Sequence, residues 1–312
     1  MSQAIRTEDL RKSLGKTTAL GGVNLEVPAG IVYGLLGPNG AGKTTIVRIL
    51  ATLIRPDAGR AFVAGHDVVR EGEAVRRLIG LTGQFAALDE ALTANENLVL
   101  IGRLSGLSSR EARSRAGGLL ETVGLSDVAG RSVRTYSGGM RRRVDLAASL
   151  VARPQVLFLD EPSTGLDPAS RLALWDLVAR TVHEGTTVLL TSQYLEEVDR
   201  LASRIAVLNH GLVVAEGTPA ALKSRVGGHV VAVRVDAALV ERAAGALAPL
   251  GKVQVEVDEI AVPTRGQAGL GEALRRLDSA GIAINEIALR TPTLDEVFLS
   301  LMNGGNHDEE AA

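Results

Sequence analysis

The amino-acid sequence predicts an α/β domain with a largely parallel sheet, followed by a smaller α+β domain. In the first part of the chain, short apolar runs such as Ile31–Leu36 alternate with longer helical patterns. Near Gly217-Thr218-Pro219 the pattern changes, and a second series of strand and helix patterns covers about 80 residues. We therefore expect a main domain over residues 1–220, a second domain over 221–303, and a disordered, acidic tail over 304–312.

The expected elements of both domains follow from hydrophobic period and from turn residues. In the main domain we expect strands over Ile31–Leu36, Gln155–Leu159 and Thr186–Thr191, and helices over Lys43–Leu53, Glu111–Val123, Met140–Ala152, Ser170–His183 and Tyr194–Ala202. In the second domain we expect strands over His229–Val235, Lys252–Val257, Ile260–Pro263 and Ala283–Leu289, and helices over Ala237–Leu247, Leu270–Ala280 and Thr293–Met302. Parallel strands joined by helices place their carboxyl ends at one edge, where α/β proteins bind ligands.

Composition removes several classes of function. The chain has no cysteine, which excludes disulfides, thiolate metal sites and cysteine nucleophiles. A net charge of -2 and an aromatic content of 3% do not favour nucleic-acid binding or base stacking. No stretch reaches the roughly 18 uninterrupted apolar residues of a spanning helix. We expect any contact with a membrane to go through a partner.

A glycine-rich loop lies between the first apolar strand and the helix that follows it. It fits the phosphate-loop pattern G-x-x-x-x-G-K-[ST] and consists of Gly37, Pro38, Asn39, Gly40, Ala41, Gly42, Lys43, Thr44 and Thr45. Glycines let backbone N–H groups approach phosphate oxygens, and the helix dipole favours the same anion. We expect Lys43 to reach the β and γ phosphates and Thr44 to bind Mg²⁺. The alternative is a glycine-rich loop that merely begins a helix.

Two adjacent carboxylates, Asp160 and Glu161, follow the apolar strand Gln155–Leu159. We expect Asp160 to take part in the Mg²⁺ shell, because this ion prefers water and one or two carboxylates. Glu161 is expected to orient or deprotonate the attacking water. An isolated Asp-Glu pair after a strand is more often a helix or turn cap, so this interpretation depends on the phosphate loop.

The segment Ser137-Gly138-Gly139 distinguishes between the kinds of P-loop protein that remain open. Its position before the acidic strand resembles the signature of ABC ATPases, where it begins a helix within a helical subdomain. The resemblance implies that Ser137, Gly138 and Gly139 face the γ-phosphate of ATP held by a second subunit. Two ATP molecules would then lie in a head-to-tail homodimer. A P-loop kinase, the alternative, is disfavoured by this segment and by the Asp160-Glu161 pair.

Four further residues take their roles only from the resemblance. Gln84 resembles the Q-loop glutamine that contacts Mg²⁺ and senses the membrane subunit, and Asp167 resembles the D-loop aspartate that communicates across the dimer. Gln193 stands where ABC proteins usually have a histidine that contacts the γ-phosphate. It can donate a hydrogen bond but cannot carry a proton. Leu14 falls near the aromatic residue that usually stacks on adenine, which weakens the expected preference for ATP over GTP.

The whole chain resembles one subgroup, the daunorubicin/doxorubicin-resistance ATP-binding subunits of actinobacteria. The segments that carry this resemblance are TLIRPDAG, TGQFAALDEALTANENL, RTYSGGMRRR, DEPSTGLDP, TSQYLEEVDRLASRI and TPTLDEVFL. The resemblance implies an ATPase at the cytoplasmic face of the membrane that drives a separate polytopic permease and exports a hydrophobic drug or lipid. The alternative, a soluble ABC ATPase acting on ribosomes or DNA repair, usually has two cassettes or a long coiled-coil insertion, and the sequence shows neither.

Three successive arginines, Arg141–Arg143, follow the signature-like segment. One short basic run without aromatic residues is usually a solvated helix face. We therefore expect no nucleic-acid partner and a solvent-facing role for these side chains.

Overall fold

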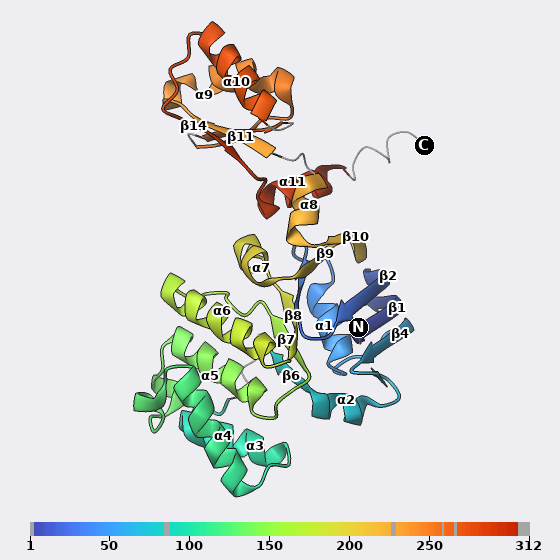
Figure 1. Ribbon diagram of the computed structural model, residues 1–312. Helices are drawn as coiled ribbons and strands as arrows, with labels where there is room; N and C mark the ends of the chain where they lie inside the picture. The colour runs from blue at the N-terminus through green and yellow to red at the C-terminus, as the bar shows by residue number, and fades with distance from the viewer. Residues whose placement is uncertain (1–2, 84–87, 226–228, 258, 265–266, 305–312) are drawn as a thin grey trace. The chain divides into compact units, whose positions relative to one another are not determined.

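A computed structural model of the chain describes residues 3–83, 88–225, 229–257, 259–264 and 267–304 (Figure 1). The chain divides into two compact units, Met1–Glu216 and Gly217–Ala312. We call them the first and the second unit and describe each by itself. Each has its own apolar core.

A six-stranded sheet runs through the first unit in the order β10-β9-β3-β8-β7-β6. The central strands β3 and β8 are parallel, as are the pairs β3–β9, β7–β8 and β6–β7. Every residue of β3, β7 and β8 is buried, as expected for strands with both faces covered. The six strands are β3 (Val32–Leu36), β6 (Ile79–Thr82), β7 (Val156–Asp160), β8 (Thr187–Thr191), β9 (Arg204–Asn209) and β10 (Leu212–Gly217).

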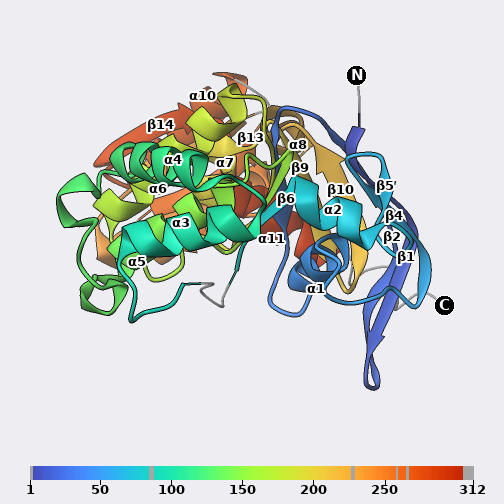
Figure 2. The same cartoon turned by 90° about the horizontal axis from the view of Figure 1, so that it is seen from below.

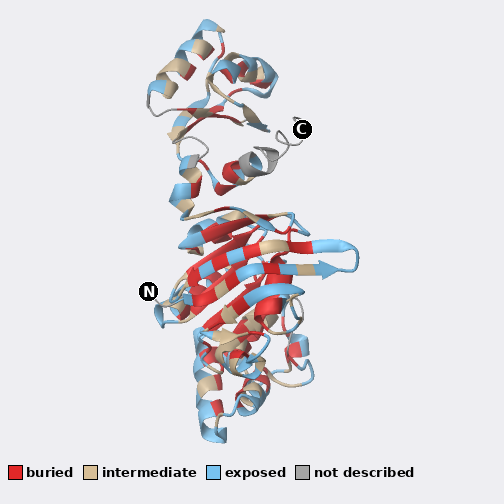
Figure 3. Ribbon diagram, turned by 90° about the vertical axis from the view of Figure 1, so that its right-hand side faces the viewer, coloured by how far each residue is buried: buried red, intermediate tan, exposed pale blue. Residues whose placement is uncertain are grey.

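A second, antiparallel sheet of the first unit has the order β2-β1-β4-β5. Buried and exposed residues alternate over Val23–Val27 of β2, so here one face of the sheet points to the core and the other to solvent (Figure 3). Helix α1 packs against β2 and β4 on one side and β7 on the other, and its Ile46, Ile49 and Leu50 are buried. The elements are β1 (Gln3–Leu14), β2 (Thr17–Pro28), β4 (Ala58–Val63), β5 (His66–Asp67) and α1 (Lys43–Leu50).

The remaining helices of the first unit cover the parallel sheet or form a helical subdomain. α6 (Pro168–His183) packs on β8, α7 (Leu195–Leu201) on β3, and α2 (Gly72–Leu78) on β5 and β6. The subdomain consists of α3 (Ala94–Leu104), α4 (Ser109–Thr122) and α5 (Gly138–Leu150), with short 3₁₀ turns at Ser126–Val128 and Val133–Thr135. Figure 2 shows α3 to α6 gathered on one side of this unit and the β1–β2 hairpin on the other.

Capping residues define where these helices begin. Thr93 with Glu96 and Ser108 with Glu111 form capping boxes at α3 and α4, in which each side chain bonds the backbone of the other residue. At the carboxyl end of α1, Thr52 has a φ of 62°, and Leu53 donates to the Arg48 carbonyl. This left-handed cap ends the helix at Leu50, three residues before the end expected from its pattern.

The second unit contains an antiparallel sheet with the order β12-β13-β11-β14. Its core joins Val231 and Val233 of β11 to Leu247 of α9 and Leu277 of α10. The helices α8 and α11 pack against each other. The elements are α8 (Pro219–Arg225), β11 (His229–Arg234), α9 (Val240–Leu247), β12 (Gln254–Glu256), β13 (Glu259–Thr264), α10 (Gln267–Ser279), β14 (Glu286–Arg290) and α11 (Leu294–Gly304), with 3₁₀ turns at Ala237–Leu239 and Ala248–Leu250. In the part of the chain that the structure describes, no helix combines the length and apolarity needed to cross a membrane.

Candidate active site

The glycine-rich loop between β3 and α1 has a backbone that only small residues permit. Gly40 and Gly42 have φ values of 82° and 105°. A Cβ at Gly42 would lie 2.5 Å from the Ala19 carbonyl oxygen, and one at Gly37 would lie 2.5 Å from the Leu208 carbonyl oxygen. Gly42 is also the N-cap of α1 and has no side chain to bond the N–H groups of the first turn. The loop therefore leaves these donors to a ligand, which suits an anion.

Lys43 is folded back over this loop. Its Nζ donates to the carbonyl oxygens of Gly37 at 2.7 Å and Pro38 at 3.1 Å, and the residue is 5% exposed. Burial lowers the pKa of Lys43, and the carboxylates of Glu161 and Asp160 oppose that shift. The ammonium group is thus held at the loop that would contain the phosphates.

Asp160 ends β7 at the same edge of the sheet as the loop. Its Oδ1 accepts hydrogen bonds from Thr44 Oγ1 at 3.2 Å and from Thr191 Oγ1 at 2.6 Å. Because β3, β8 and β7 are adjacent and parallel, their carboxyl ends bring these three residues together. Asp160 and Thr191 are both buried. The structure therefore brings together the two oxygen groups expected to hold Mg²⁺.

Glu161 and Gln193 contact each other beside this cluster. Gln193 Nε2 donates to Glu161 Oε2 at 2.6 Å. Glu161 has a φ of 51°, unusual for a residue with a side chain, and its N–H lies 3.1 Å from both the carbonyl oxygen and Oγ1 of Thr191. The carboxylate of Glu161 is thus set by its own backbone and by the amide of Gln193.

The signature-like segment forms the first turn of α5. Ser137 is the N-cap and accepts from Met140 N at 3.2 Å; Ser137 and Gly138 are exposed. A Cβ at Gly139 would lie 2.5 Å from Ser170 Oγ. Ser170 in turn donates to both carboxylate oxygens of Asp167, the N-cap of α6, and these bonds lower the pKa of Asp167. Within one chain, Asp167 thus lies beside the signature turn and caps a helix.

A cavity of about 390 Å³ connects the signature turn to the acidic strand. Its lining includes Gly83, Gly138, Arg142 and Glu161.

The expectation of a solvated arginine face is wrong. Arg141 pairs with Glu90 at 3.0 Å, and Arg143 donates to the Val123 carbonyl at 2.9 Å. Arg142 donates to four backbone carbonyls. All three side chains are partly buried, because α5 is covered by the other helices of the subdomain and by the segment after β7.

One expected residue falls outside the described ranges, and another, Leu14, does not join the cluster. Gln84 lies outside the described residues. Leu14 ends β1, pairs with Thr17 at the tip of the β1–β2 hairpin and is half exposed.

The donor chemistry of the cluster fits magnesium. Thr44 and Asp160 offer hard oxygen atoms, and a single carboxylate suits an ion that keeps several waters and takes phosphate oxygens as ligands. Across the described ranges no group of three or more His, Cys, Asp or Glu side chains is arranged to hold a metal by itself. The site therefore suits a metal that arrives with a nucleotide.

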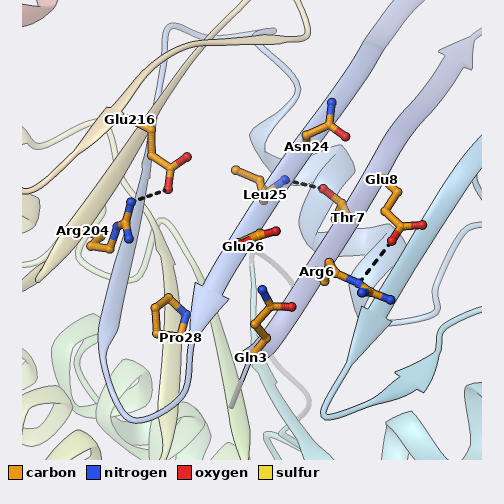
Figure 4. Close-up of a pocket in the computed structure, with 10 residues that line it drawn as sticks. All are labelled: Gln3, Arg6, Thr7, Glu8, Asn24, Leu25, Glu26, Pro28, Arg204 and Glu216. Carbon is orange, nitrogen blue, oxygen red and sulfur yellow. Dashed lines mark hydrogen bonds and ion pairs between the residues drawn. The ribbon is translucent and has the colours of Figure 1, made fainter. Parts of the chain in front are cut away.

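A larger cavity, of about 550 Å³, lies over the antiparallel sheet and is lined by none of the expected site residues (Figure 4). Four of its charged side chains form ion pairs, with Arg6 3.3 Å from Glu8 and Arg204 3.2 Å from Glu216. Figure 4 also shows Thr7 Oγ1 beside the N–H of Leu25, a bond of 2.9 Å. Since these groups bond one another, they serve the packing of the protein itself, and we do not assign this cavity to the active site.

Two residues of the cluster were missed in the sequence. Thr191 is the last residue of an apolar strand, and its polar side chain at that place was a usable signal. Arg142 belongs to the run Arg141–Arg143, for which the sequence predicts a solvated helix face. Its burial depends on which segment covers α5, and this cannot be determined from periodicity.

Comparison with known proteins gives one consistent result. The family model described as ABC transporter matches residues 20–164. A daunorubicin resistance ATP-binding protein of Streptomyces coeruleorubidus is 54% identical over 99% of both chains. A daunorubicin/doxorubicin resistance ATP-binding protein of Streptomyces peucetius is 50% identical over 100% of this chain and 97% of its own.

A solved structure agrees with these relatives. The dimeric, post-hydrolysis state of an ATP-binding cassette with ADP and Pi superposes with a TM-score of 0.63 and 26% identity, over 69% of this chain and 98% of that one. The expected P-loop α/β fold is confirmed. The chain belongs to the ABC transporter family and is an ATP-hydrolysing, ATP-binding protein of the daunorubicin/doxorubicin-resistance subgroup.

Proposed function

We propose that this chain hydrolyses Mg-ATP in a head-to-tail homodimer and thereby drives a separate membrane permease that exports a hydrophobic drug or lipid. The observation that carries the catalytic part is the arrangement at one sheet edge, where Thr44 meets Asp160 and Gln193 meets Glu161. This edge combines hydrogen-bond donors for phosphate, oxygen ligands for a metal ion and a proton acceptor in one site.

The phosphates of ATP bind in the loop Gly37–Thr45. The N–H groups of the first turn of α1 and the ammonium group of Lys43 surround the β and γ phosphates, and Lys43 exchanges its bonds to Gly37 and Pro38 for phosphate oxygens. Fixed donors in a partly buried site stabilise the negative charge of the transition state more strongly than water does.

Thr44 and Asp160 would hold the magnesium ion, and Gln84 would be a third ligand. When bound, the ion neutralises charge that develops on the phosphate oxygens.

Glu161 acts on the attacking water. Its carboxylate accepts a hydrogen bond from the water and takes its proton as the oxygen attacks the γ-phosphorus and the bond to ADP breaks. Gln193 holds that carboxylate and donates to the γ-phosphate, but it cannot take up the proton. Proton transfer therefore falls to Glu161 alone.

The dimer and the permease complete the cycle. Exposed Ser137 and Gly138 bind the γ-phosphate of ATP held by a second copy, with Gly139 behind them and Asp167 at the shared interface. Leu14 provides an apolar contact to the base. We assign residues 1–220 to the ATPase and residues 221–303 to an accessory domain that regulates or stabilises the dimer. The full-length similarity to resistance proteins supports drug export and a place at the cytoplasmic face of the membrane.

The partner can be identified directly. Tagged Glu161→Gln protein, which should keep ATP bound, is incubated with detergent-solubilised native membranes and Mg-ATP, and the copurifying proteins are identified by mass spectrometry. Lys43→Ala protein, which should bind nucleotide weakly, is the matched control. We expect a polytopic membrane protein in near-stoichiometric yield with Glu161→Gln and much less of it with Lys43→Ala. Ribosomal or DNA-repair proteins in its place would overturn the transport function while leaving the ATPase.

A further inference from the structure

Arg142 of α5 uses its entire guanidinium group in hydrogen bonds. Nε donates to the Pro162 carbonyl at 2.8 Å, and Nη1 to the Gly83 carbonyl at 2.8 Å and to Asp145 at 3.4 Å. Nη2 lies 3.2 Å from the Glu161 carbonyl and 3.4 Å from that of Asp160. A guanidinium has five N–H donors, and each of the five has an acceptor here.

The four carbonyls belong to two segments that are far apart in the sequence. Asp160, Glu161 and Pro162 follow β7 and include the proposed metal ligand and proton acceptor. Gly83 follows β6. The arginine itself lies on the helix whose N-cap is Ser137. One side chain therefore joins the signature helix to the backbone of the catalytic segment and to the end of β6.

The bond to the Glu161 carbonyl has a specific conformational effect. Glu161 has a left-handed backbone, which is unfavourable for a residue with a side chain. Thr191 holds the N–H of Glu161 from β8, and Arg142 holds its carbonyl from α5. With both ends of the residue fixed, the side chain projects to Gln193. Thr164 N also donates to the Glu161 carbonyl, at 3.4 Å, so Arg142 provides the shorter bond and the one that comes from another element. Without Arg142, only the longer bond from the same segment would oppose relaxation to an ordinary backbone conformation.

The position favours arginine over any other cation. The side chain of Arg142 is 17% exposed, and that of Asp145, which balances its charge, is 6% exposed. Burial lowers the pKa of Arg142, and Asp145 opposes this shift. Lysine has three donors on one atom and cannot reach acceptors spread around a planar fork.

We propose that Arg142 is a positioning residue for ATP hydrolysis, which fixes the left-handed backbone of Glu161 and ties it to the signature helix. The proposal rests on the proposed role of Glu161. Arg142 contacts the backbone of the segment, so it acts on the rate of hydrolysis through Glu161 and has little effect on the affinity for Mg-ATP.

The test measures single-turnover hydrolysis of Mg-ATP and the Kd for Mg-ATP with the full-length protein. Arg142→Ala should lower the rate by about 100-fold, the size of effect expected when a catalytic group is displaced by about 1 Å, with Kd changed less than about threefold. Arg142→Lys should recover only a small part of the loss. Arg143→Ala, on the same helix, removes one bond to Val123 and should hydrolyse ATP at the wild-type rate.

A double-mutant comparison separates positioning from general damage. In a Glu161→Gln background, Arg142→Ala should lower the residual rate no further, because the group through which it acts is already altered. An equal loss in both backgrounds, or a wild-type rate in Arg142→Ala, would overturn the proposal. If Arg142→Ala fails to fold, the same comparison is made with Arg142→Lys. Wild-type hydrolysis by Glu161→Gln would instead overturn the proposed role of Glu161.

Discussion

Gln193 donates from Nε2 to Glu161 Oε2 at 2.6 Å, and the two residues follow the adjacent parallel strands β8 and β7. An uncharged donor on a carboxylate leaves its negative charge intact. Gln193 therefore orients Glu161 without competing for the proton that Glu161 is proposed to accept.

Replacing Gln193 tests this relationship. Gln193→Ala should slow single-turnover hydrolysis by about 10- to 100-fold, since the carboxylate loses its orienting donor. Gln193→His should introduce a pH dependence, with the rate falling as pH drops through about 6.5, because an imidazolium makes the Glu161 carboxylate a weaker proton acceptor. The measurement is the pH–rate profile of both proteins and the wild type. Parallel profiles for Gln193→His and wild type would contradict the prediction.

Thr191 should be important for hydrolysis although it is buried and bonds only other residues of the site. Thr191→Val keeps the shape but removes the hydroxyl that bonds Asp160 Oδ1 and the N–H of Glu161. We expect a loss of about 1.5–3 kcal/mol in unfolding free energy, since one bond is to a charged group, together with a clear fall in hydrolysis. Thr187→Val on the same strand removes a bond to Gly30 N and is the control, with hydrolysis unchanged. Equal effects of both substitutions on hydrolysis would argue against a specific role of Thr191.

Removing the Thr44 hydroxyl should affect the metal more than the nucleotide. Thr44→Val takes away one of the two oxygen groups that fit magnesium, so the Mg²⁺ concentration for half-maximal hydrolysis should rise by about tenfold or more. ATP binding measured in excess EDTA should stay near the wild-type value, because no metal takes part there. A normal Mg²⁺ dependence of the Thr44→Val protein would show that Thr44 is not a metal ligand.

Glu197 should make stability depend on pH. It lies fully buried on α7 and accepts a bond from Trp175 Nε1 at 2.9 Å. Burial raises its pKa above the ordinary value, while Ser192, Trp175, Ser163 and Arg171 oppose that shift. The folded chain thus binds this proton more tightly than the unfolded chain. The stability that protonated Glu197 contributes to the fold is fully present below the unfolded pKa of about 4.3. It is lost as pH rises through the raised pKa of the folded chain.

The uncharged Glu197→Gln protein lacks this dependence. It should be more stable than wild type in urea at about pH 8, and the difference should shrink as pH falls towards about 5. Fluorescence of Trp175, the single tryptophan of the chain, follows the unfolding. A constant difference at all pH values would show that the carboxyl does not titrate in this way.

The sequence predicts those parts of the site that lie within one continuous segment. It does not predict contacts that depend on which strands are neighbours in the sheet. The phosphate loop and the Asp160-Glu161 pair are local patterns, and both occupy the expected places at strand ends. The contact of Gln193 with Glu161 depends on β8 lying next to β7, and apolar runs do not reveal the order of strands. The sequence around Arg142 would be the same whether α5 were covered or exposed, so it does not predict that this side chain is buried.

The antiparallel sheet shows the limit for the fold. No strand was expected over residues 3–28, yet β1 and β2 occupy nearly all of them. Their pairing contains register shifts, for example between Thr7 and Leu10, which break the simple alternation that marks a strand. By contrast, the mostly apolar strands β7 and β8 agree with the predicted bounds to within one residue.

The close packing of Gly139 against Ser170 has a consequence for observing this protein at work. Because a Cβ at Gly139 would lie 2.5 Å from Ser170 Oγ, we expect the exposed turn Ser137-Gly138 and the start of α6 to move together. Helix α6 also carries Trp175, deep in the core. We therefore expect a rearrangement of this outer turn to alter the emission of a single internal fluorophore, which would let the working cycle be followed in real time without attaching any dye.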